Sequence, residues 1–188
     1  VDYYIPDRFN EGYGLNKDAI SNLSDAGFKL LISVDCGISS LEEVDLANCL
    51  GMEVIITDHH TPPLIQPRAL AIINPKNDAC ESLKDLAGAG VAFKLICALG
   101  QGRISEEKLW NYLDLVALAT VSDIVNLQGE NRILVKYGLP RLGKTQRPGL
   151  RALMREVDLK DKELCSWHLA FLLAPRLNSA GRLGSARD

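Results

Sequence analysis

The spacing of apolar residues along the chain changes near residue 80. In the first 75 residues, short apolar runs alternate with stretches in which apolar residues recur every three to four positions. The apolar runs VDYYI, FKLLISV, MEVIIT and RALAIIN are typical of strands, whereas LNKDAISNLSDAG and SSLEEVDLANCLG have the spacing and end signals of helices. Because strand, helix and strand follow one another with short connections, the pattern predicts parallel strands joined by right-handed crossovers.

From about residue 83 the period is helical. Gly, Pro and polar breaks separate five such stretches: LAGAGVAFKLICALG, SEEKLWNYLDLVALATVSDIV, ENRILVKYGLPRLGK, RPGLRALMREV and KELCSWHLAFLLAP. We therefore predict an α/β fold in which a parallel sheet with flanking helices is followed by a helical segment. We assign residues 1–80 to the parallel α/β half of one domain, and residues 81–188 to its mainly helical remainder. Since the chain starts within a predicted strand and stops without a terminator, we expect a piece of a longer protein.

The charges are distributed unevenly along the chain. Residues 1–135 have a balance of −9 between basic and acidic side chains, and residues 136–188 a balance of +6. Two such poles suit an acidic cation site beside a surface that receives phosphates, and ordinary solvated helix faces suit the same numbers. The basic stretch formed by Lys144, Arg147, Arg151 and Arg155 is open to both interpretations, a solvated face or a face toward DNA.

The cysteines and the distribution of apolar residues indicate the cellular compartment of the protein. The five cysteines are an odd number without a C-x-x-C pair, which argues against a disulfide framework or a zinc knuckle and favours a reducing cytoplasm. No apolar run approaches the roughly 18 residues that a membrane span needs. The first residues also lack the basic start and apolar middle of a signal peptide. We expect a cytoplasmic protein that does not bind membranes.

Polar residues follow three of the predicted strands. Asp35 comes after LLISV, the triplet Asp58, His59 and His60 comes after EVIIT, and Asp7 and Arg8 come after DYYIP. Ligands of open parallel sheets bind beyond the carboxyl ends of the strands. Asp35 and His59 are 24 residues apart, one strand–helix–strand unit, so they should end neighbouring strands. A carboxylate with an imidazole suits Mn²⁺ or Mg²⁺, and the histidine favours manganese.

The other two members of the triplet have different expected roles. Successive side chains of a strand diverge, so we expect His60 to meet the substrate, as a donor to a phosphate or as a proton carrier, rather than the same ion. Asp58 is placed to orient an imidazole. A structural interpretation stays open, in which Asp35 caps the helix that starts near Ser39 and the triplet forms a turn before TPP.

A further acid, Asp123, lies in the apolar stretch LATVSDIVNL. Burying a carboxylate there is costly unless it is paired or bound to a cation, which favours a metal ligand. A helix N-cap is the alternative. The metal hypothesis requires the side chains of Asp35, His59 and Asp123 to converge.

Six blocks of the sequence resemble, in this order, the DHH phosphoesterase superfamily: PDRFNEGYGLN, SVDCGISS, ITDHHTPP, LAGAGVAFKL, DLVALATVSDIVNLQGENRILVKYGL and PRLNSAGRL. Within it they are most similar to the bacterial 5′→3′ exonucleases specific for single-stranded DNA, over essentially the whole chain. The resemblance implies a hydrolase of DNA repair and recombination that cleaves phosphodiesters with two Mn²⁺ or Mg²⁺ ions. Implied partners are single-stranded DNA, single-strand-binding protein and a RecQ-type helicase.

The resemblance also assigns roles to single residues. It implies metal ligands at Asp35, His59 and Asp123, a catalytic group at His60 that contacts the scissile phosphate, and substrate-binding groups at Arg8, Arg176, Asn178 and Arg182. Arg8 would receive the 5′ phosphate of DNA, and the last three would lie near the nucleic-acid path. We also expect Asp58, placed to orient an imidazole, among the catalytic groups.

The chain departs from the superfamily in what it lacks. The first family motif, an Asp-x-Asp, and the C-terminal domains have no counterpart in these residues, so we expect this piece alone to have little or no nuclease activity. Two other hypotheses stay open. One is a DHH phosphoesterase that acts on oligonucleotides, cyclic dinucleotides or pyrophosphate, and the other is a replication scaffold that keeps the fold without catalysis.

Overall fold

The computed structural model of this chain describes residues 1–7, 11–77 and 81–183, with side chains described up to residue 179. Two compact units are present, one formed by Val1–Lys84 with Ser179–Asp188 and the other by Asp85–Asn178. The first contains the parallel sheet and the second is helical, which confirms the predicted α/β class. The assignment of both parts to one domain, divided at residue 80, stays a prediction.

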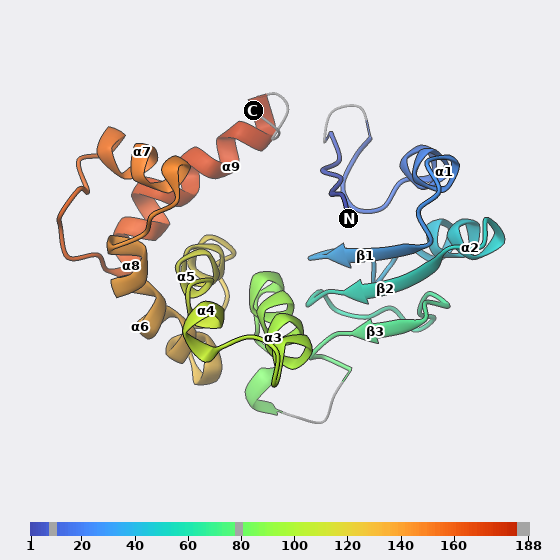
Figure 1. The fold of residues 1–188 in the computed structure, drawn as a ribbon, viewed down its shortest axis with the longest axis horizontal. Helices are drawn as coiled ribbons and strands as arrows, with labels where there is room; N and C mark the ends of the chain where they lie inside the picture. Colours follow the sequence, from blue (N-terminus) through green and yellow to red (C-terminus); the bar gives the residue numbers. More distant parts are fainter. Residues whose placement is uncertain (8–10, 78–80, 184–188) are drawn as a thin grey trace. The chain divides into compact units, whose positions relative to one another are not determined.

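The first unit is organised by a three-stranded parallel sheet in the order β1-β2-β3. Figure 1 draws the three strands as neighbouring arrows that point the same way: β1 (Leu30–Val34), β2 (Glu53–Thr57) and β3 (Ala71–Ile73). In the register, Val34 is paired with Thr57, and Thr57 with Ile73. All three strands therefore end at one level, and the residues that follow them start from the same edge of the sheet.

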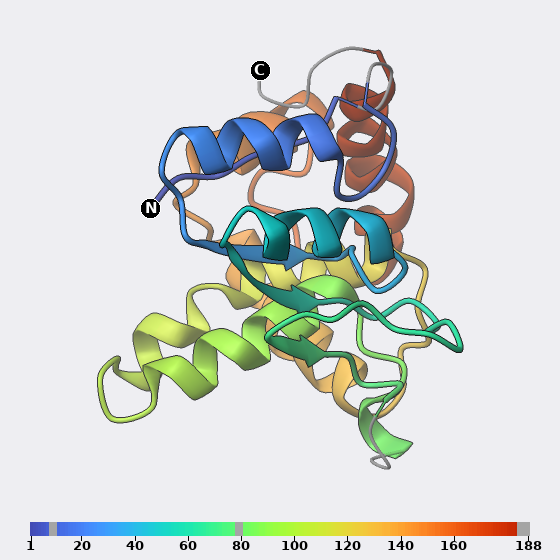
Figure 2. The ribbon, with the colours of Figure 1, turned by 90° about the vertical axis from the view of Figure 1, so that its right-hand side faces the viewer.

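Two helices pack on this sheet, α1 (Lys17–Asp25) and α2 (Leu41–Cys49), and a short 3-10 turn, η1 (Glu81–Leu83), closes the unit (Figure 2). The side-chain oxygen of Asn16 caps α1 by accepting a hydrogen bond from the Ala19 N–H at 2.7 Å. Ser40 occupies the N-cap position of α2 without a side-chain capping bond. The helices and β2 share one buried apolar cluster, made of Ile20, Val44, Ala47, Met52, Val54 and Ile56.

The predicted first strand, VDYYI, is wrong. Residues 1–7 are described without strand structure, and the sheet begins with β1. A pocket of about 640 Å³ is lined by residues 1–4, Pro6 and all of β1. An apolar run becomes a strand only through ladder hydrogen bonds with a neighbour, and within the described ranges residues 1–7 make no such bond to β1. Leu30, Ile32 and Val34 are accordingly 43–55% exposed.

The second unit consists of helices joined by short turns. They are α3 (Gly88–Gly100), α4 (Glu106–Trp110), α5 (Leu113–Ser122), α6 (Gly129–Gly143), α7 (Pro148–Glu156), α8 (Ser166–His168), the π-helical turn η2 (Leu169–Leu173) and the start of α9 (Ala174–Leu183). Their core is a cluster of nine buried side chains: Leu118, Val121, Val135, Leu142, Met154, Leu159, Leu164, Leu169 and Leu173. Within the described ranges no helix has the length and apolar character needed to cross a membrane.

Two helix boundaries differ from the prediction. The single helix expected over SEEKLWNYLDLVALATVSDIV is divided into α4 and α5. Between them, the N–H groups of Asn111 and Tyr112 donate to the carbonyl groups three residues back, which forms a 3-10 turn instead of an α-helical one. The helix expected to end at Pro175 continues beyond it. The wider π turn η2 ends two residues before this proline, which has no N–H to donate to the usual carbonyl, and the shifted bonding of the π turn accommodates the missing hydrogen bond.

α5 and α6 approach each other closely at Gly138. A Cβ atom added at Gly138 would lie 2.3 Å from the carbonyl oxygen of Leu113 and 2.4 Å from the Cβ of Ala117. Both distances are well below van der Waals contact, so only glycine allows the two helices to pack at this separation.

Candidate metal centre

A sharp turn after β1 places Asp35 at the edge of the sheet. The Asp35 N–H extends the ladder by donating to the carbonyl of Thr57 at 2.9 Å, and the residue then adopts a left-handed conformation with a φ of 64°. Aspartate tolerates this region better than most residues with a side chain. Gly37 follows with a φ of 108°, and the Ser33 hydroxyl donates to the Cys36 carbonyl at 2.7 Å, which closes the turn.

A second turn follows β2 and is organised by Asp58, which is only 1% exposed. Its Oδ1 accepts hydrogen bonds from the backbone N–H groups of His59 at 2.7 Å and of His60 at 3.1 Å. The same oxygen lies 2.6 Å from Nδ1 of His60, and Oδ2 accepts from the Ile38 N–H at 2.9 Å. Burial alone would raise the pKa of Asp58, but these hydrogen bonds outweigh it and hold the pKa below its usual range. Asp58 is therefore an ionised acceptor that fixes the His60 ring.

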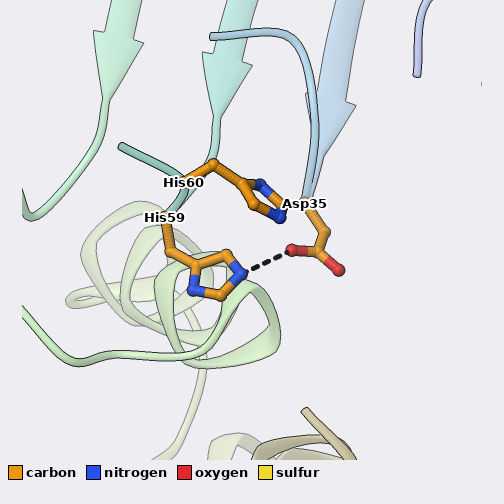
Figure 3. A group of neighbouring side chains, drawn as sticks. All are labelled: Asp35, His59 and His60. Carbon is orange, nitrogen blue, oxygen red and sulfur yellow. Dashed lines mark ion pairs between the residues drawn. The ribbon is translucent and has the colours of Figure 1, made fainter. Parts of the chain in front are cut away.

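Asp35, His59 and His60 converge in front of the strand ends (Figure 3). Nε2 of His59 lies 3.2 Å from Oδ1 of Asp35, and the centroids of the two imidazole rings are 4.5 Å apart. One ligand atom from each of the three residues lies within 4.8 Å of the other two. The expectation that His60 diverges from His59 is wrong, because β2 ends at Thr57 and the alternation of side chains ends with it.

The donor set fits a divalent cation. Oδ1 of Asp35 is a buried oxygen that accepts no hydrogen bond from the described residues, which leaves it available to a positive charge. A carboxylate with an imidazole, as Asp35 and His59 provide, matches Mn²⁺ better than Mg²⁺, which prefers oxygen ligands. Cys36 lies next to this set, but burial, assisted by the charges of Asp58 and Asp35, raises the pKa of its thiol to about 11. Cys36 is not one of the three converging groups of the centre.

Two supporting residues were not predicted. Asn74, which is 2% exposed, donates from Nδ2 to the His60 carbonyl at 2.9 Å, and the Tyr13 hydroxyl donates to the Asp35 carbonyl at 2.6 Å. The Tyr13 ring also meets the His60 ring edge to face, with centroids 6.2 Å apart. Asn74 follows β3, so the strand-end rule that indicated Asp35 could have found it. Tyr13 lies in a loop without such a signal.

Replacing Tyr13 by phenylalanine is expected to lower Mn²⁺ affinity by about tenfold, the lower part of the range for residues that orient metal ligands. The reason is that the ring stays while the hydrogen bond that holds the Asp35 backbone is lost. Isothermal titration with Mn²⁺ measures the change. Tyr137→Phe, at an exposed tyrosine of α6, is the matched control and should bind as the wild type does. Equal affinities of all three proteins would show that Tyr13 does not support Asp35.

The structural alternatives for the two acids are also resolved. Asp35 does not cap α2, which begins at Leu41 after Ser40, and its carboxylate faces His59 instead. Asp123 is not a helix N-cap, since it occupies the C-cap position of α5, and it is exposed rather than buried. It belongs to the second unit, so its convergence with Asp35 and His59 stays a prediction.

The expected substrate-binding residues are not part of this cluster as described. Arg176 is exposed at the start of α9 and donates from Nη1 to the Leu172 carbonyl at 2.8 Å, and Asn178 is exposed two residues further on. Arg182 falls within the bounds of α9, with its side chain outside the described part. Arg8 lies outside the described residues.

Comparison with known proteins gives a consistent family match. The model of the DHH family, N-terminal domain, matches residues 1–120. The chain is 46% identical over 187 residues to the single-stranded-DNA-specific exonuclease RecJ of Bacillus subtilis, with 99% of this chain and 23% of that protein covered. It is 44% identical over 196 residues to the same exonuclease of Escherichia coli, with 97% of this chain and 34% of that protein covered.

A solved structure agrees in fold. The crystal structure of exonuclease RecJ bound to manganese matches with a TM-score of 0.85 and 39% identity, over 97% of this chain and 46% of that chain. The chain thus spans about a quarter to a third of the length of these two curated relatives.

Proposed function

Because the chain belongs to the DHH family, whose N-terminal domain it matches over residues 1–120, we propose that it is the catalytic core of a metal-dependent 5′→3′ exonuclease acting on single-stranded DNA. The longer protein would be a hydrolase of DNA repair and recombination. The similarity to RecJ exonucleases over nearly the whole chain supports this activity and substrate.

The observation that carries the proposal is the convergence of Asp35, His59 and His60. Three groups that bind cations or carry protons gather from two adjacent strand ends, within 4.8 Å of one another. A scaffold without catalysis has no need to bury the His59 imidazole beside the carboxylate of Asp35, since desolvating a polar group costs stability. The arrangement therefore favours an enzyme.

Asp35 and His59 would hold a divalent ion, Mn²⁺ or Mg²⁺, and Asp123 of the second unit would complete the ligand set. Two ions are expected in the complete enzyme. When bound, they supply Lewis-acid polarisation of the phosphodiester and ease the ionisation of water.

His60 would be the catalytic proton carrier. Its Nδ1 faces the ionised Asp58, so Nδ1 carries the proton and Nε2 is the atom that exchanges protons or donates to a phosphate oxygen. Half of its side chain is exposed, which leaves the ring accessible to substrate. Asp58, expected among the catalytic groups, would act through His60 as a positioning residue.

The remaining roles extend the proposal to the complete protein. Arg8 would receive the 5′ phosphate, and Arg176, Asn178 and Arg182 would contact the strand. Single-strand-binding protein and a RecQ-type helicase are the proposed protein partners. The free thiols of Cys36, Cys49, Cys97 and Cys165 support a reducing compartment such as the cytoplasm.

The test uses the full-length protein with Mn²⁺ and end-blocked oligonucleotides. A single strand with phosphorothioates at its 3′ end should be degraded, and the same strand blocked at its 5′ end should survive. A duplex and a dinucleotide of the same sequence serve as comparison substrates. Degradation of the dinucleotide alone, or loss of the strand that is blocked at the 5′ end, would contradict the proposed activity.

Replacing His60 by alanine is expected to lower turnover by about 100-fold, within the range for loss of a general acid–base group. Mn²⁺ affinity should change far less, because Asp35 and His59 remain. Mn²⁺ titration and single-strand kinetics on the same preparation separate the two effects. A parallel loss of metal binding and turnover would make His60 a third ligand instead, which its distance from Asp35 permits.

A further inference from the structure

The second unit carries two arginine side chains stacked on aromatic rings. The guanidinium carbon of Arg141 lies 5.5 Å from the ring centroid of Trp110, and that of Arg147 lies 5.8 Å from the ring centroid of Tyr112. Nη1 of Arg141 also donates to the side-chain oxygen of Asn111, the residue between Trp110 and Tyr112 in the sequence, at 3.4 Å. The rings are half exposed, Trp110 at 49% and Tyr112 at 41%. We call these four side chains, Trp110, Tyr112, Arg141 and Arg147, the arginine–aromatic strip.

Buried groups hold one end of the strip in place. Asp114, only 4% exposed, accepts hydrogen bonds from Nε of Arg147 at 3.0 and 3.2 Å and from the Thr145 hydroxyl at 2.7 Å. Within the described part of the chain, no hydrogen bond to the Nη atoms of Arg147 is present, and its side chain is 38% exposed. The guanidinium of Arg147 is thus held by Asp114 through Nε and by the ring of Tyr112, and its two Nη groups are available to an anion.

The segment that leads from α6 into α7 is basic, without an acidic residue between Arg141 and Arg155. Lys144 and Arg151, both exposed, lie on the segment that leads from α6 into α7, on either side of Arg147 in the sequence. The acids Glu106 and Glu107 lie one turn before Trp110 on α4. An anionic partner would therefore approach from the side of α6 and α7.

We propose that the arginine–aromatic strip binds single-stranded DNA, a proposal that rests on the exonuclease function proposed above. Guanidinium groups suit the phosphates of a strand, and exposed aromatic rings suit its bases, which can stack only when they are unpaired. An acidic protein segment would use the arginines but would gain little from two flat rings. The pairing of each exposed ring with an arginine therefore favours a nucleic-acid strand.

The experiment measures binding of a fluorescent oligothymidylate to the full-length protein in EDTA, where hydrolysis is stopped, at several salt concentrations. Trp110→Ala should weaken binding by about tenfold through lost stacking and leave the salt slope unchanged. Arg141→Ala should weaken binding and lower the magnitude of the slope of log affinity against log salt by about 1, for one phosphate contact. Trp110 and Arg141 are both partly exposed, so their replacement should not unfold the protein. Arg147 is not replaced, because the buried carboxylate of Asp114 would then lose its cationic partner.

Lys136→Ala is the matched control, because Lys136 lies 5.6 Å from the ring of Tyr137 on the same helix and belongs to no comparable strip. It should bind as the wild type does. In one outcome, the wild type binds and degrades single strands while Trp110→Ala and Arg141→Ala keep its affinity and salt slope. That result would refute DNA binding by the strip and leave the proposed function intact. A wild type that does not bind single strands would overturn the proposed function itself. Weakened binding of a polyglutamate peptide, with DNA binding intact, would make the strip a protein-docking surface and overturn its assignment to DNA.

Discussion

Replacing Asp35 by asparagine in the full-length protein should lower the turnover of single-stranded DNA by roughly 1,000-fold, equal to about 4 kcal/mol of transition-state stabilisation. Asp35 provides the carboxylate of the candidate metal centre, and its Oδ1 is directed at Nε2 of His59. Asparagine keeps the size of the side chain and tolerates the left-handed backbone with a φ of 64°, so the turn after β1 should survive. Only the negative charge is removed. Mn²⁺ binding should weaken together with turnover, since a neutral amide is a poor ligand for a hard cation.

Asp45→Asn is the control for this substitution, because Asp45 is an exposed acid on α2 of the same unit. It should retain the turnover and the Mn²⁺ affinity of the wild type. Circular dichroism of both variants checks that the fold is intact. Nearly normal turnover in a folded Asp35→Asn protein would remove Asp35 from the metal centre and leave the proposed hydrolysis without its main ligand.

The largest expected effect on stability comes from Gly138→Ala, which should lower the free energy of unfolding by about 3 kcal/mol. The new methyl group would lie 2.3 Å from the Leu113 carbonyl oxygen, and backbone cannot move aside as a flexible side chain can. α5 and α6 would have to separate, which opens the core around Leu118 and Val135. Urea denaturation followed by circular dichroism measures the loss.

Gly143→Ala provides an internal comparison at the end of the same helix, since nothing lies within 4 Å of a Cβ added there. This variant should be as stable as the wild type or more stable by about 0.5–1 kcal/mol, because alanine restricts the unfolded chain. If Gly138→Ala and Gly143→Ala had the same stability, the close approach of α5 and α6 would not be a constraint on the fold.

Local pattern was enough to predict the part of the site that depends on the sheet. β1 and β2 are short apolar runs with clear boundaries, and the crossover between them fixes their direction and neighbourhood. Because β1 and β2 end side by side at Val34 and Thr57, Asp35 and His59 follow at the same edge of the sheet and lie close together. The same rule applied to β3 would have indicated Asn74.

Other features depend on contacts that no local pattern contains. The pairing of Tyr13 with Asp35 joins residues 22 positions apart through a loop. His60 turns toward His59 because Asp58 captures its ring and its N–H, which the alternation of a strand does not describe. The apolar run VDYYI satisfied the pattern of a strand, but a strand also needs a neighbour at ladder distance, and that depends on packing.

Asp58 makes the order of the DHH triplet as important as its composition. The carboxylate closes a turn by reaching forward to the N–H groups of the next two residues, which only a short acceptor in the leading position can do. A permuted triplet, His-Asp-His or His-His-Asp, would keep every functional group and the net charge. It would nevertheless bury an imidazole where four donors need an anion. The function of the triplet therefore depends on the order of its three residues, and we expect a permuted triplet to lose the turn that holds His59 and His60 in place.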